Sequence, residues 1–389
     1  ELGFDEMTHP QVVTTELLHF AKRNLFWHPY DANLYDGLKG ALRVLHGRAW
    51  GLLRGGAMVH LASGRTRSAV STVMVVGGGI GGMRAALDLA DAGLRAYIVE
   101  HAACLGGRVA QLGYMFPQHD CVLCRGTPDH GYGCTRPSIS PAYIEHNQHP
   151  NIEVLTNTHI LDVAGQAGDF TVSLRQEPTY VDSTRCINCG YCAQACPVEL
   201  PDRYQQGMAS HKAAYKVAPR AAPDTYVIER GAYCNGCEKC AEVCPTHAID
   251  LHAQPRLLNV EVGAIVLALG FEVFDPGQME ELGYGRYPNV LQAMQYERLA
   301  SRSGPTQGVI TRPSDGRNPR SIAWLQCIGS RDQNHTYCSS ICCMYATKEA
   351  MLAKQRLGDQ VECSIFIMDE RAFNKEYSTY FARAREEYN

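Results

Sequence analysis

The 389-residue sequence lacks any long apolar run. A helix needs about 18 consecutive apolar residues to cross a bilayer, and no stretch of the sequence approaches that length. The stretch "GAIVLALGFEVF" at 263–274 is far too short and predicts a buried strand followed by a turn. No transmembrane segment is therefore expected.

The sequence also lacks an excess of charge of either sign. Its 36 Lys and Arg residues nearly balance 40 Asp and Glu residues, which leaves a net charge of -4. This balance argues against nucleic acid or an anionic membrane surface as the main partner. Residue 1 is Glu, and no charged-then-apolar signal segment follows it. We expect the numbering to start inside a longer or processed polypeptide and to stop at residue 389 before its last unit is complete.

Cysteine, by contrast, is abundant: the sequence has 17. Disulfide-rich secreted proteins are usually short and carry an even number of cysteines. Here the chain is long enough for two or three domains, the count is odd, and the cysteines cluster in C-x-x-C pairs. Metal ligation in a reducing cytoplasm is therefore favoured over disulfides. Buried free thiols are the alternative, but random burial would not repeat a spacing.

The first 100 residues predict a helical arm followed by a β-α-β unit. In residues 1–70 the apolar residues between Leu38 and Leu53 recur at helical spacing, with basic residues around them, which is typical of an amphipathic helix facing a core. From residue 72 a strand "TVMVV", a loop "GGGIGG", a helix and a second strand "RAYIVE" follow in turn.

The glycine loop predicts a dinucleotide site. The G-x-G-x-x-G pattern follows an apolar strand and opens a helix, which is the context this motif requires. Gly77 permits the tight turn, Gly79 allows the pyrophosphate to approach the backbone, and Gly82 allows helix and strand to pack closely; Gly81 lies beside it in the loop. The free N–H groups at the helix start favour an anion. Glu100 ends the second strand, where its carboxylate can accept both ribose hydroxyls.

Two further segments favour FAD over NAD in this site. The segment "CLGGRV" at 104–109 resembles the Gly-Gly segment of flavoproteins with two dinucleotide-binding domains, and contributes Gly106, Gly107 and Arg108. The segment "GAIVLALGF" resembles a strand of the same proteins that usually ends Ala-Thr-Gly. It contributes Ala268 and Gly270, with Leu269 in place of the Thr.

Two copies of one cysteine motif predict a pair of [4Fe-4S] clusters. "CINCGYCAQACP" at 186–197 and "CNGCEKCAEVCP" at 234–245 both follow C-x2-C-x2-C-x3-C-P. This is the bacterial two-cluster ferredoxin pattern, in which the fourth cysteine of each motif serves the other cluster. One cluster is assigned to Cys186, Cys189, Cys192 and Cys244, and the other to Cys234, Cys237, Cys240 and Cys196. A zinc interpretation would leave the extra cysteines and both prolines unexplained.

With these motifs in place, the chain resembles the iron–sulfur flavoproteins that form the A subunit of heterodisulfide reductases, the HdrA-like family, from about residue 72 onward. The resemblance rests on the glycine loop and helix, the ferredoxin block, and several shorter matches in order: "FPQHDCVLC", "HPNIEVLT", "RPSDGRNP", "LQCIGSRD", "YCSSICCMYATKEA" and "MDERAF".

The resemblance implies an α/β fold: a thioredoxin-reductase-like core with two dinucleotide-type domains, an inserted two-cluster ferredoxin domain and a helical N-terminal arm. The expected boundaries are 1–70 for the arm, 71–182 and 257–318 for the two parts of the FAD domain, 183–256 for the ferredoxin insert, and 319–389 for a nicotinamide-type domain that has lost its glycine loop. In that last domain the resemblance implies a third [4Fe-4S] cluster on Cys327, Cys338, Cys342 and Cys343. The alternative is a dithiol pair of a disulfide reductase.

A fourth group, Cys104, Cys121, Cys124 and Cys134, stays open. These four either close a cluster on their own, or Cys121 and Cys124 share one with a partner chain, or they are free thiols. Three clusters are thus expected, with a fourth undecided.

The favoured hypothesis is a cytoplasmic oxidoreductase component that transfers electrons between FAD and iron–sulfur clusters, and that works with other reductase subunits and with ferredoxin or another electron carrier. The resemblance allows flavin-based electron bifurcation, membrane association through partners and a homodimer within the complex. One alternative is a quinone-interacting relative in sulfur metabolism, and another is an assembly scaffold with structural cofactors. No catalytic acid or base is assigned, because His119, Asp120 and Lys348 are more often solvated or supporting residues. The terminal donor and acceptor are not encoded in any motif.

Overall fold

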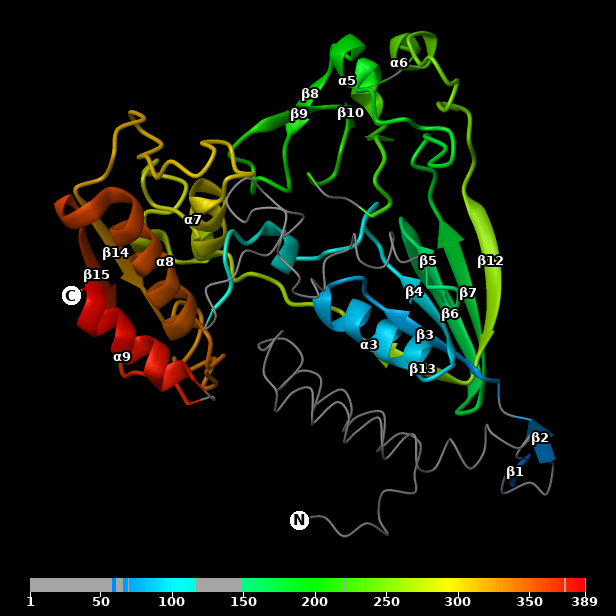
Figure 1. The fold of residues 1–389 in the computed structure, drawn as a ribbon, viewed down its shortest axis with the longest axis horizontal. Coiled ribbons are helices and arrows are strands. Elements are labelled where there is room, and N and C mark those ends of the chain that lie inside the picture. The colour runs from blue at the N-terminus through cyan, green and yellow to red at the C-terminus, as the bar shows by residue number, and fades with distance from the viewer. Residues whose placement is uncertain are drawn as a thin grey trace. The chain divides into compact units, whose positions relative to one another are not determined.

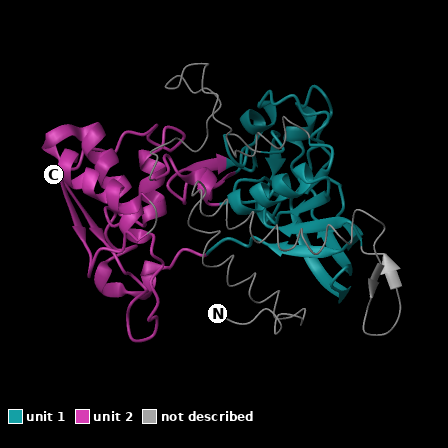
Figure 2. Cartoon of the chain, turned by 60° about the horizontal axis from the view of Figure 1, so that its bottom comes forward, with its two compact units in different colours: residues 1–107, 139–198, 212–271 teal, residues 108–138, 199–211, 272–389 magenta. Residues whose placement is uncertain are grey.

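The computed structural model describes residues 58–60, 66–68, 70–116, 149–219, 222–234, 236–373 and 376–388. The chain divides into two units, which Figure 2 shows in teal and magenta. Unit 1 comprises residues 1–107, 139–198 and 212–271, and unit 2 comprises residues 108–138, 199–211 and 272–389.

Unit 1 is built on a four-stranded parallel sheet in the order β13-β3-β4-β5. Its strands are β3 (Thr72–Val76), β4 (Arg95–Val99), β5 (Ile152–Leu155) and β13 (Ala264–Leu267). Helix α3 (Ile80–Asp91) connects β3 to β4 and packs on one face of the sheet (Figure 1). Its Met83 and Leu87 lie in one core cluster with Val75 and Ile98 of the strands. Such a sheet is covered on both faces, which is why β3 is apolar from Val73 to Val76.

The other face of the parallel sheet is covered by a three-stranded antiparallel sheet in the order β12-β7-β6. Its strands are β6 (Thr158–Gln166), β7 (Asp169–Gln176) and β12 (Arg256–Val262). Val172 and Leu174 of β7 lie in one core cluster with Met74 of β3 and Val99 of β4. The alternation of buried and exposed residues in "FTVSL" is thus explained by one face of β7 meeting the core.

The cysteine-rich segment consists of short elements joined by tight turns. In unit 1 they are α5 (Tyr191–Ala195), β10 (Ala214–Tyr215), β11 (Val227–Ile228), η3 (Ala232–Cys234) and α6 (Lys239–Glu242), with β10 and β11 antiparallel. Between α5 and β10 lies a hairpin of β8 (Glu199–Pro201) and β9 (Ser210–Lys212). Residues 199–211 of this hairpin belong to unit 2, although they fall inside the predicted ferredoxin insert.

Unit 2 contains a second β-α-β arrangement. Strands β14 (Ser321–Leu325) and β15 (Glu362–Phe366) are parallel and are connected by α8 (Cys342–Leu357). The core around Trp324 receives Tyr296 and Ala300 from α7 (Ala293–Ala300) and Ala346 and Ala353 from α8. The other elements are η2 (Val109–Gln111), η4 (Pro276–Gln278), η5 (Glu280–Leu282), η6 (Gly358–Gln360) and α9 (Tyr377–Tyr388), which packs on α8 (Figure 1).

Two expected elements differ in the structure. The composition of "PNVLQAMQYERLASRSG" at 288–304 predicts one helix, but α7 begins only at Ala293, because a reciprocal capping box between Gln292 and Gln295 starts it there, and it ends at Ala300. In the arm expected to be helical, residues 58–60 and 66–68 instead form an antiparallel pair, β1 (Met58–His60) and β2 (Thr66–Ser68). The rest of that arm, including the stripe from Leu38 to Leu53, lies outside the described residues. None of the helices in the described part of the chain combines the length and apolar character needed to span a membrane.

Candidate functional site

The glycine loop of unit 1 has the geometry that the dinucleotide motif requires. Gly77 has a φ of +105°, and a Cβ placed on it would lie 2.2 Å from the carbonyl oxygen of Ala268. A Cβ on Gly82 would lie 1.8 Å from the carbonyl oxygen of Gly77, so the close approach of α3 to the loop requires a glycine at position 82. A Cβ on Gly79 would meet nothing within 4 Å. The loop is therefore closed on its protein side and open at the position where a pyrophosphate would approach. Gly81 lies in the first turn of α3.

Glu100 holds this loop from the end of β4. Its side chain is 5% exposed, and its two carboxylate oxygens accept hydrogen bonds from Gly78 N at 2.6 Å and Ala102 N at 2.7 Å. His101 lies 2.9 Å from the same carboxylate. The acidic side chain that was predicted to bind ribose thus lies beside the loop in a position fixed by backbone donors.

The two segments that favoured FAD are placed against the loop. Gly106 N donates to the Gly78 carbonyl at 2.9 Å, and a Cβ on Gly107 would lie 3.1 Å from the Cα of Gly79. Ala268 N donates to the Val76 carbonyl at 2.8 Å, and Gly270 has a φ of +80°. Arg108, the residue before η2, belongs to unit 2. Whether these residues bind FAD stays a prediction.

The ferredoxin segment forms a cavity lined by the four cysteines assigned to the first cluster. Cys186, Cys189 and Cys192 come from the loop before α5 and its first turn, and Cys244 follows α6. The cavity measures about 320 Å³, part of it open to solvent. Its other walls include apolar side chains and Tyr226, whose hydroxyl would lie 3.0 Å from a Cβ on Gly190.

The electrostatics of this cavity differ from one cysteine to the next. Burial raises the pKa of Cys192 to about 11, and the neighbouring Cys186 and Cys189 add to that rise. Desolvation also acts to raise the pKa of Cys244, but hydrogen bonds from Ala248 N, at 3.3 Å, and from Thr246 outweigh it and lower this pKa. A positive ion or cluster that binds thiolates would offset the cost of ionising the buried members.

The second ferredoxin set is also partly assembled. Cys196, Cys234 and Cys240 are buried, and Cys234 and Cys196 both help to raise the pKa of Cys240, after desolvation as the main cause. Cys237 is half-buried. No group of three His, Cys, Asp or Glu side chains in the described ranges is arranged to hold a single metal ion. A cubane spaces its thiolates more widely than one tetrahedral ion, because each thiolate binds a different iron.

The third set lies in unit 2 at the end of β14 and the start of α8. Cys327 follows β14 with a φ of +61°, and Cys342 and Cys343 open the helix. The thiol of Cys342 hydrogen-bonds to Cys343 and lowers the pKa of Cys343 to about 6, while Cys327 lies close enough to influence Cys342. The N-terminal end of α8 also favours a thiolate there. Cys338 accepts a hydrogen bond from Ser340 N at 3.3 Å.

Of the fourth group only Cys104 can be described. It is 7% exposed, and burial, with a contribution from Glu100, raises its pKa to about 12. Cys121, Cys124 and Cys134, together with His119 and Asp120, lie outside the described residues. Of the two alternatives expected for Lys348, a solvated or a supporting residue, the structure excludes the first, because Lys348 is fully buried in unit 2 and its Nζ forms an ion pair with Glu297. Glu297 and Glu349 are also buried, and the sequence did not single them out.

Comparison with known families defines the class of the protein. A family model described as a 4Fe-4S dicluster domain matches residues 182–248, and one described as an NAD(P)-binding Rossmann-like domain matches residues 75–126. The chain is therefore a mixed α/β protein that combines a Rossmann-like dinucleotide-binding domain with a two-cluster iron–sulfur domain.

Individual relatives narrow this class. The chain is 42% identical over 317 residues to the second iron–sulfur A subunit of the CoB–CoM heterodisulfide reductase of Methanopyrus kandleri, covering 81% of this chain and 46% of the relative. It is 38% identical, with the same coverage, to the A subunit of the "H(2):CoB-CoM heterodisulfide,ferredoxin reductase" of Methanothermobacter marburgensis. The chain thus belongs to the family of heterodisulfide reductase A subunits, as its motifs predicted, and it spans less than half the length of these relatives. Among solved structures, L-proline dehydrogenase from P. horikoshii aligns over 79% of this chain and 37% of its own, with 13% identity and a TM-score of only 0.30.

Proposed function

We propose that this chain is an FAD- and [4Fe-4S]-containing electron-transfer part of a heterodisulfide-reductase-like complex, and hence an oxidoreductase component. The observation that carries the proposal is the cysteine cavity of unit 1. It gathers three cysteines of one motif and Cys244 of the other, which is the exchange that two-cluster ferredoxins use. A dithiol enzyme or a zinc site has no need of that exchange.

The dinucleotide loop supports the flavin half of the proposal. The loop is closed on its protein side at Gly77 and Gly82 and is open at Gly79. Glu100 lies at the end of β4, where it would accept the ribose hydroxyls. A bound flavin would supply the exchange between two-electron and one-electron chemistry. The chain's own contribution is to hold the pyrophosphate on the N-terminus of α3 and to keep bulky side chains away from it.

The third cysteine set supports electron transfer to an iron–sulfur cluster rather than to a nicotinamide. The turn after β14 carries Cys327 where a nicotinamide-binding domain would have its glycine loop, and Cys342 and Cys343 occupy the start of α8. Thiolates there would repel a pyrophosphate and bind iron. Cysteine sets in both units would supply two separate one-electron acceptors, which is one of the conditions for flavin-based electron bifurcation.

The names of the two relatives describe parts of reductase complexes, and one of them names ferredoxin. We therefore propose partner reductase subunits and a ferredoxin-type carrier for this chain, in the reducing cytoplasm that its free thiols require. A homodimer within the complex is part of the same proposal.

The test is the iron, acid-labile sulfide and FAD content of anaerobically purified full chain. About twelve irons per FAD means three clusters, and about sixteen means that the Cys121 group holds a fourth. Dithionite should reduce both flavin and clusters, with the clusters followed by electron paramagnetic resonance. Clusters that stay oxidised while the flavin is reduced would favour a scaffold. Rapid bleaching of the flavin by NADPH alone, with no companion protein, would overturn the proposal.

A matched pair of variants tests the carrying observation. Cys244→Ser should remove about four irons and the signal of one cluster, because Cys244 lines the cavity with the first motif. Cys363→Ser is the control, since Cys363 lies in β15 outside every motif and is half-buried. Equal iron content in the two variants would contradict the assignment.

A further inference from the structure

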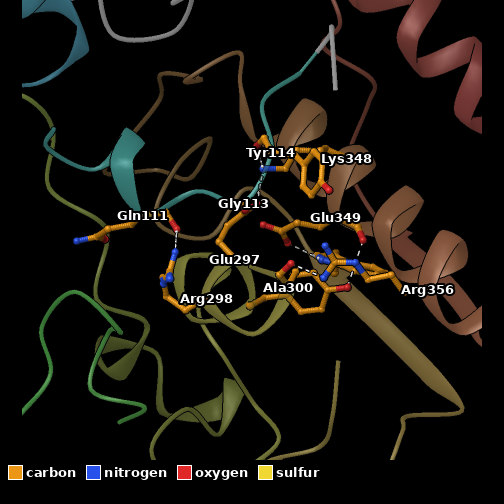
Figure 3. A network of polar contacts seen from close by, with 11 residues as sticks. Gln111, Gly113, Tyr114, Glu297, Arg298, Ala300, Lys348, Glu349 and Arg356 are labelled. Carbon is orange, nitrogen blue, oxygen red and sulfur yellow. Dashed lines mark hydrogen bonds and ion pairs between the residues drawn. The ribbon is translucent and has the colours of Figure 1, made fainter. Parts of the chain in front are cut away.

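Three charged side chains of unit 2 are buried together on two facing helices. Figure 3 draws Glu297 of α7 together with Lys348 and Glu349 of α8. Glu297 is 2% exposed, and Lys348 and Glu349 are 0% exposed. Ionisable groups are almost never fully buried unless they are paired. Two carboxyl groups and one ammonium cannot all be paired one to one, so the partners of each must be counted.

Lys348 is committed to Glu297. Its Nζ forms an ion pair with Glu297 Oε1 and donates a hydrogen bond to the Tyr114 carbonyl oxygen at 2.9 Å. The other oxygen of Glu297 accepts from Gly113 N at 3.3 Å. Glu297 therefore has both a counter-ion and a backbone donor, as an ionised carboxylate needs.

Glu349 has no cation of its own. Its Oε2 accepts a hydrogen bond from Trp324 Nε1 at 2.7 Å, but its Oε1 is buried and has no donor among the described residues. The negative charge of Glu297 acts on Glu349 and disfavours its ionised form. A buried carboxylate has no hydrogen to donate and needs a donor or a cation at each oxygen, so Glu349, which has a donor at only one oxygen and no cation of its own, is better satisfied when it carries a proton.

The other ionisable groups around the pair do not supply that charge. Arg356 Nη1 donates to the carbonyl oxygens of Ala300 and Gly308, and Arg298 donates to Gln205, Gln111 and Ser303, all of them neutral acceptors. Burial raises the pKa values of four other neighbours, which therefore stay neutral at pH 7: Tyr296 of α7, Tyr345 of α8, Cys363 of β15 and Tyr380 of α9.

The energetic balance points the same way. Desolvation is the main cause that raises the pKa of Glu349 well above its usual range, and the charge of Glu297 adds to it; Lys348 opposes both but does not outweigh them. Two carboxyl groups in one dry site cannot both ionise, and one of them keeps a proton.

From this geometry we infer that Glu349 and Glu297 form a buried proton-binding site that holds one proton between them at neutral pH, with Lys348 balancing the remaining negative charge. The bound species is a proton, and the site is one that the glycine and cysteine motifs do not include.

The position of this site on α8 gives it a role in the proposed electron transfer. Glu349 follows Cys343 by six residues on the same helix, about 9 Å along its axis. The shared proton makes the Glu297, Lys348 and Glu349 group neutral rather than negative. An electron added to a cluster on the α8 cysteines then meets less repulsion. This second part rests on the proposed function, whereas the proton itself does not.

Infrared spectroscopy of the full chain tests both parts. At pH 7 the wild type should show the carbonyl stretch of a protonated carboxylic acid, above the amide band and lowered in D₂O. Glu349→Gln, which keeps the shape of a neutral carboxyl group and the acceptor for Trp324, should lose that band. The control Glu362→Gln, at an exposed glutamate of β15, should keep it. Because the band requires no cofactor, it is measured equally well on protein without iron or flavin.

The reduced-minus-oxidised difference spectrum of the loaded protein tests the link to electron transfer. A shift of the same band on reduction by dithionite, absent from Glu349→Gln, is the expected result. Wild-type protein without a protonated-carboxyl band at pH 7, or a band that survives in Glu349→Gln, would overturn the proton site, whatever cofactors the chain binds. A band that does not respond to reduction would overturn the link to the α8 cysteines alone. Should Glu349→Gln fail to fold, the wild-type band and its D₂O shift still decide the first question.

Discussion

The glycine loop allows fold stability and ligand binding to be separated by two substitutions that each add a single methyl group. At Gly82 the added Cβ would lie 1.8 Å from the Gly77 carbonyl oxygen and 3.3 Å from Val75 Cγ1. At Gly79 it would meet nothing within 4 Å, and the backbone there, with a φ of -72°, suits any residue. Gly82→Ala should therefore disturb the packing of the fold, whereas Gly79→Ala should only fill space in front of the loop.

The expected magnitude at Gly82 follows from the contact. Non-bonded atoms prefer separations of roughly 3.5 Å, and the obstacle is a backbone carbonyl that cannot rotate away, so α3 must move. Overpacking of this kind costs about 1–3 kcal/mol, sometimes more, against a gain of about 1 kcal/mol from replacing Gly by Ala in a helix. The 1.8 Å contact places Gly82→Ala at the upper end of that range, so we expect a net loss of about 2 kcal/mol, which corresponds to a fall in Tm of about 4–8 °C for a unit of about 200 residues.

Gly79→Ala should leave the stability of the flavin-free protein within about 1 kcal/mol of the wild type, because Gly79 offers no side-chain cap to lose. Its FAD affinity should fall at least about tenfold, which is 1.4 kcal/mol. Thermal unfolding of the flavin-free proteins, and FAD titration followed by flavin fluorescence, measure the two quantities separately. A Gly82→Ala variant as stable as the wild type, or a Gly79→Ala variant that binds FAD with unchanged Kd, would refute the reasoning.

Two further predictions concern the buried charges of unit 2. Arg298→Met should lower the free energy of unfolding by about 3 kcal/mol, because the Arg298 side chain is fully buried and its loss leaves Gln205, Gln111 and Ser303 short of donors. The exposed control Arg317→Met should cost under about 0.5 kcal/mol in the same urea titration. Equal losses in the two variants would rule out the buried network as the cause. The raised pKa of Glu349 predicts that the free energy of unfolding depends on pH, because the folded chain keeps a proton that the unfolded chain releases above pH about 4.3. The contribution of this proton to stability is therefore fully present below that pH and is lost as pH rises toward the folded pKa. Glu349→Gln should match the wild type at pH 4 and exceed it increasingly from pH 5 to pH 8, and a constant difference across that range would contradict the assignment.

Local patterns in the sequence predicted much of unit 1 correctly. The strand "TVMVV", the glycine loop and α3 follow one another in a few residues, and each is determined by neighbours in the chain: apolar residues for a strand covered on both faces, glycines for the turn. The match of residues 182–248 to a 4Fe-4S dicluster domain confirms the ferredoxin block for a similar reason, since C-x2-C-x2-C-x3-C-P encodes its own local geometry.

The start of α7 shows where local patterns mislead. The stretch "PNVLQAMQYERLASRSG" has the composition of one long helix, but the reciprocal hydrogen bonds of Gln292 and Gln295 begin it at Ala293. Such a capping pair differs little in sequence from two ordinary helical glutamines. The strands at 58–60 and 66–68 were missed because three-residue strands are too short to show a period.

By itself, then, the sequence indicated which residues to propose for the chemistry, glycines before a helix and cysteines at ligand spacing, because each of these motifs is formed by residues close together in the chain. Only the tertiary structure decided that Glu297, Lys348 and Glu349 are buried together. In "YERLA" and "ATKEA" these residues look like the solvated faces of two ordinary helices. Their unusual state arises because α7 and α8 turn those faces toward each other and exclude the water that would otherwise keep every charge independent.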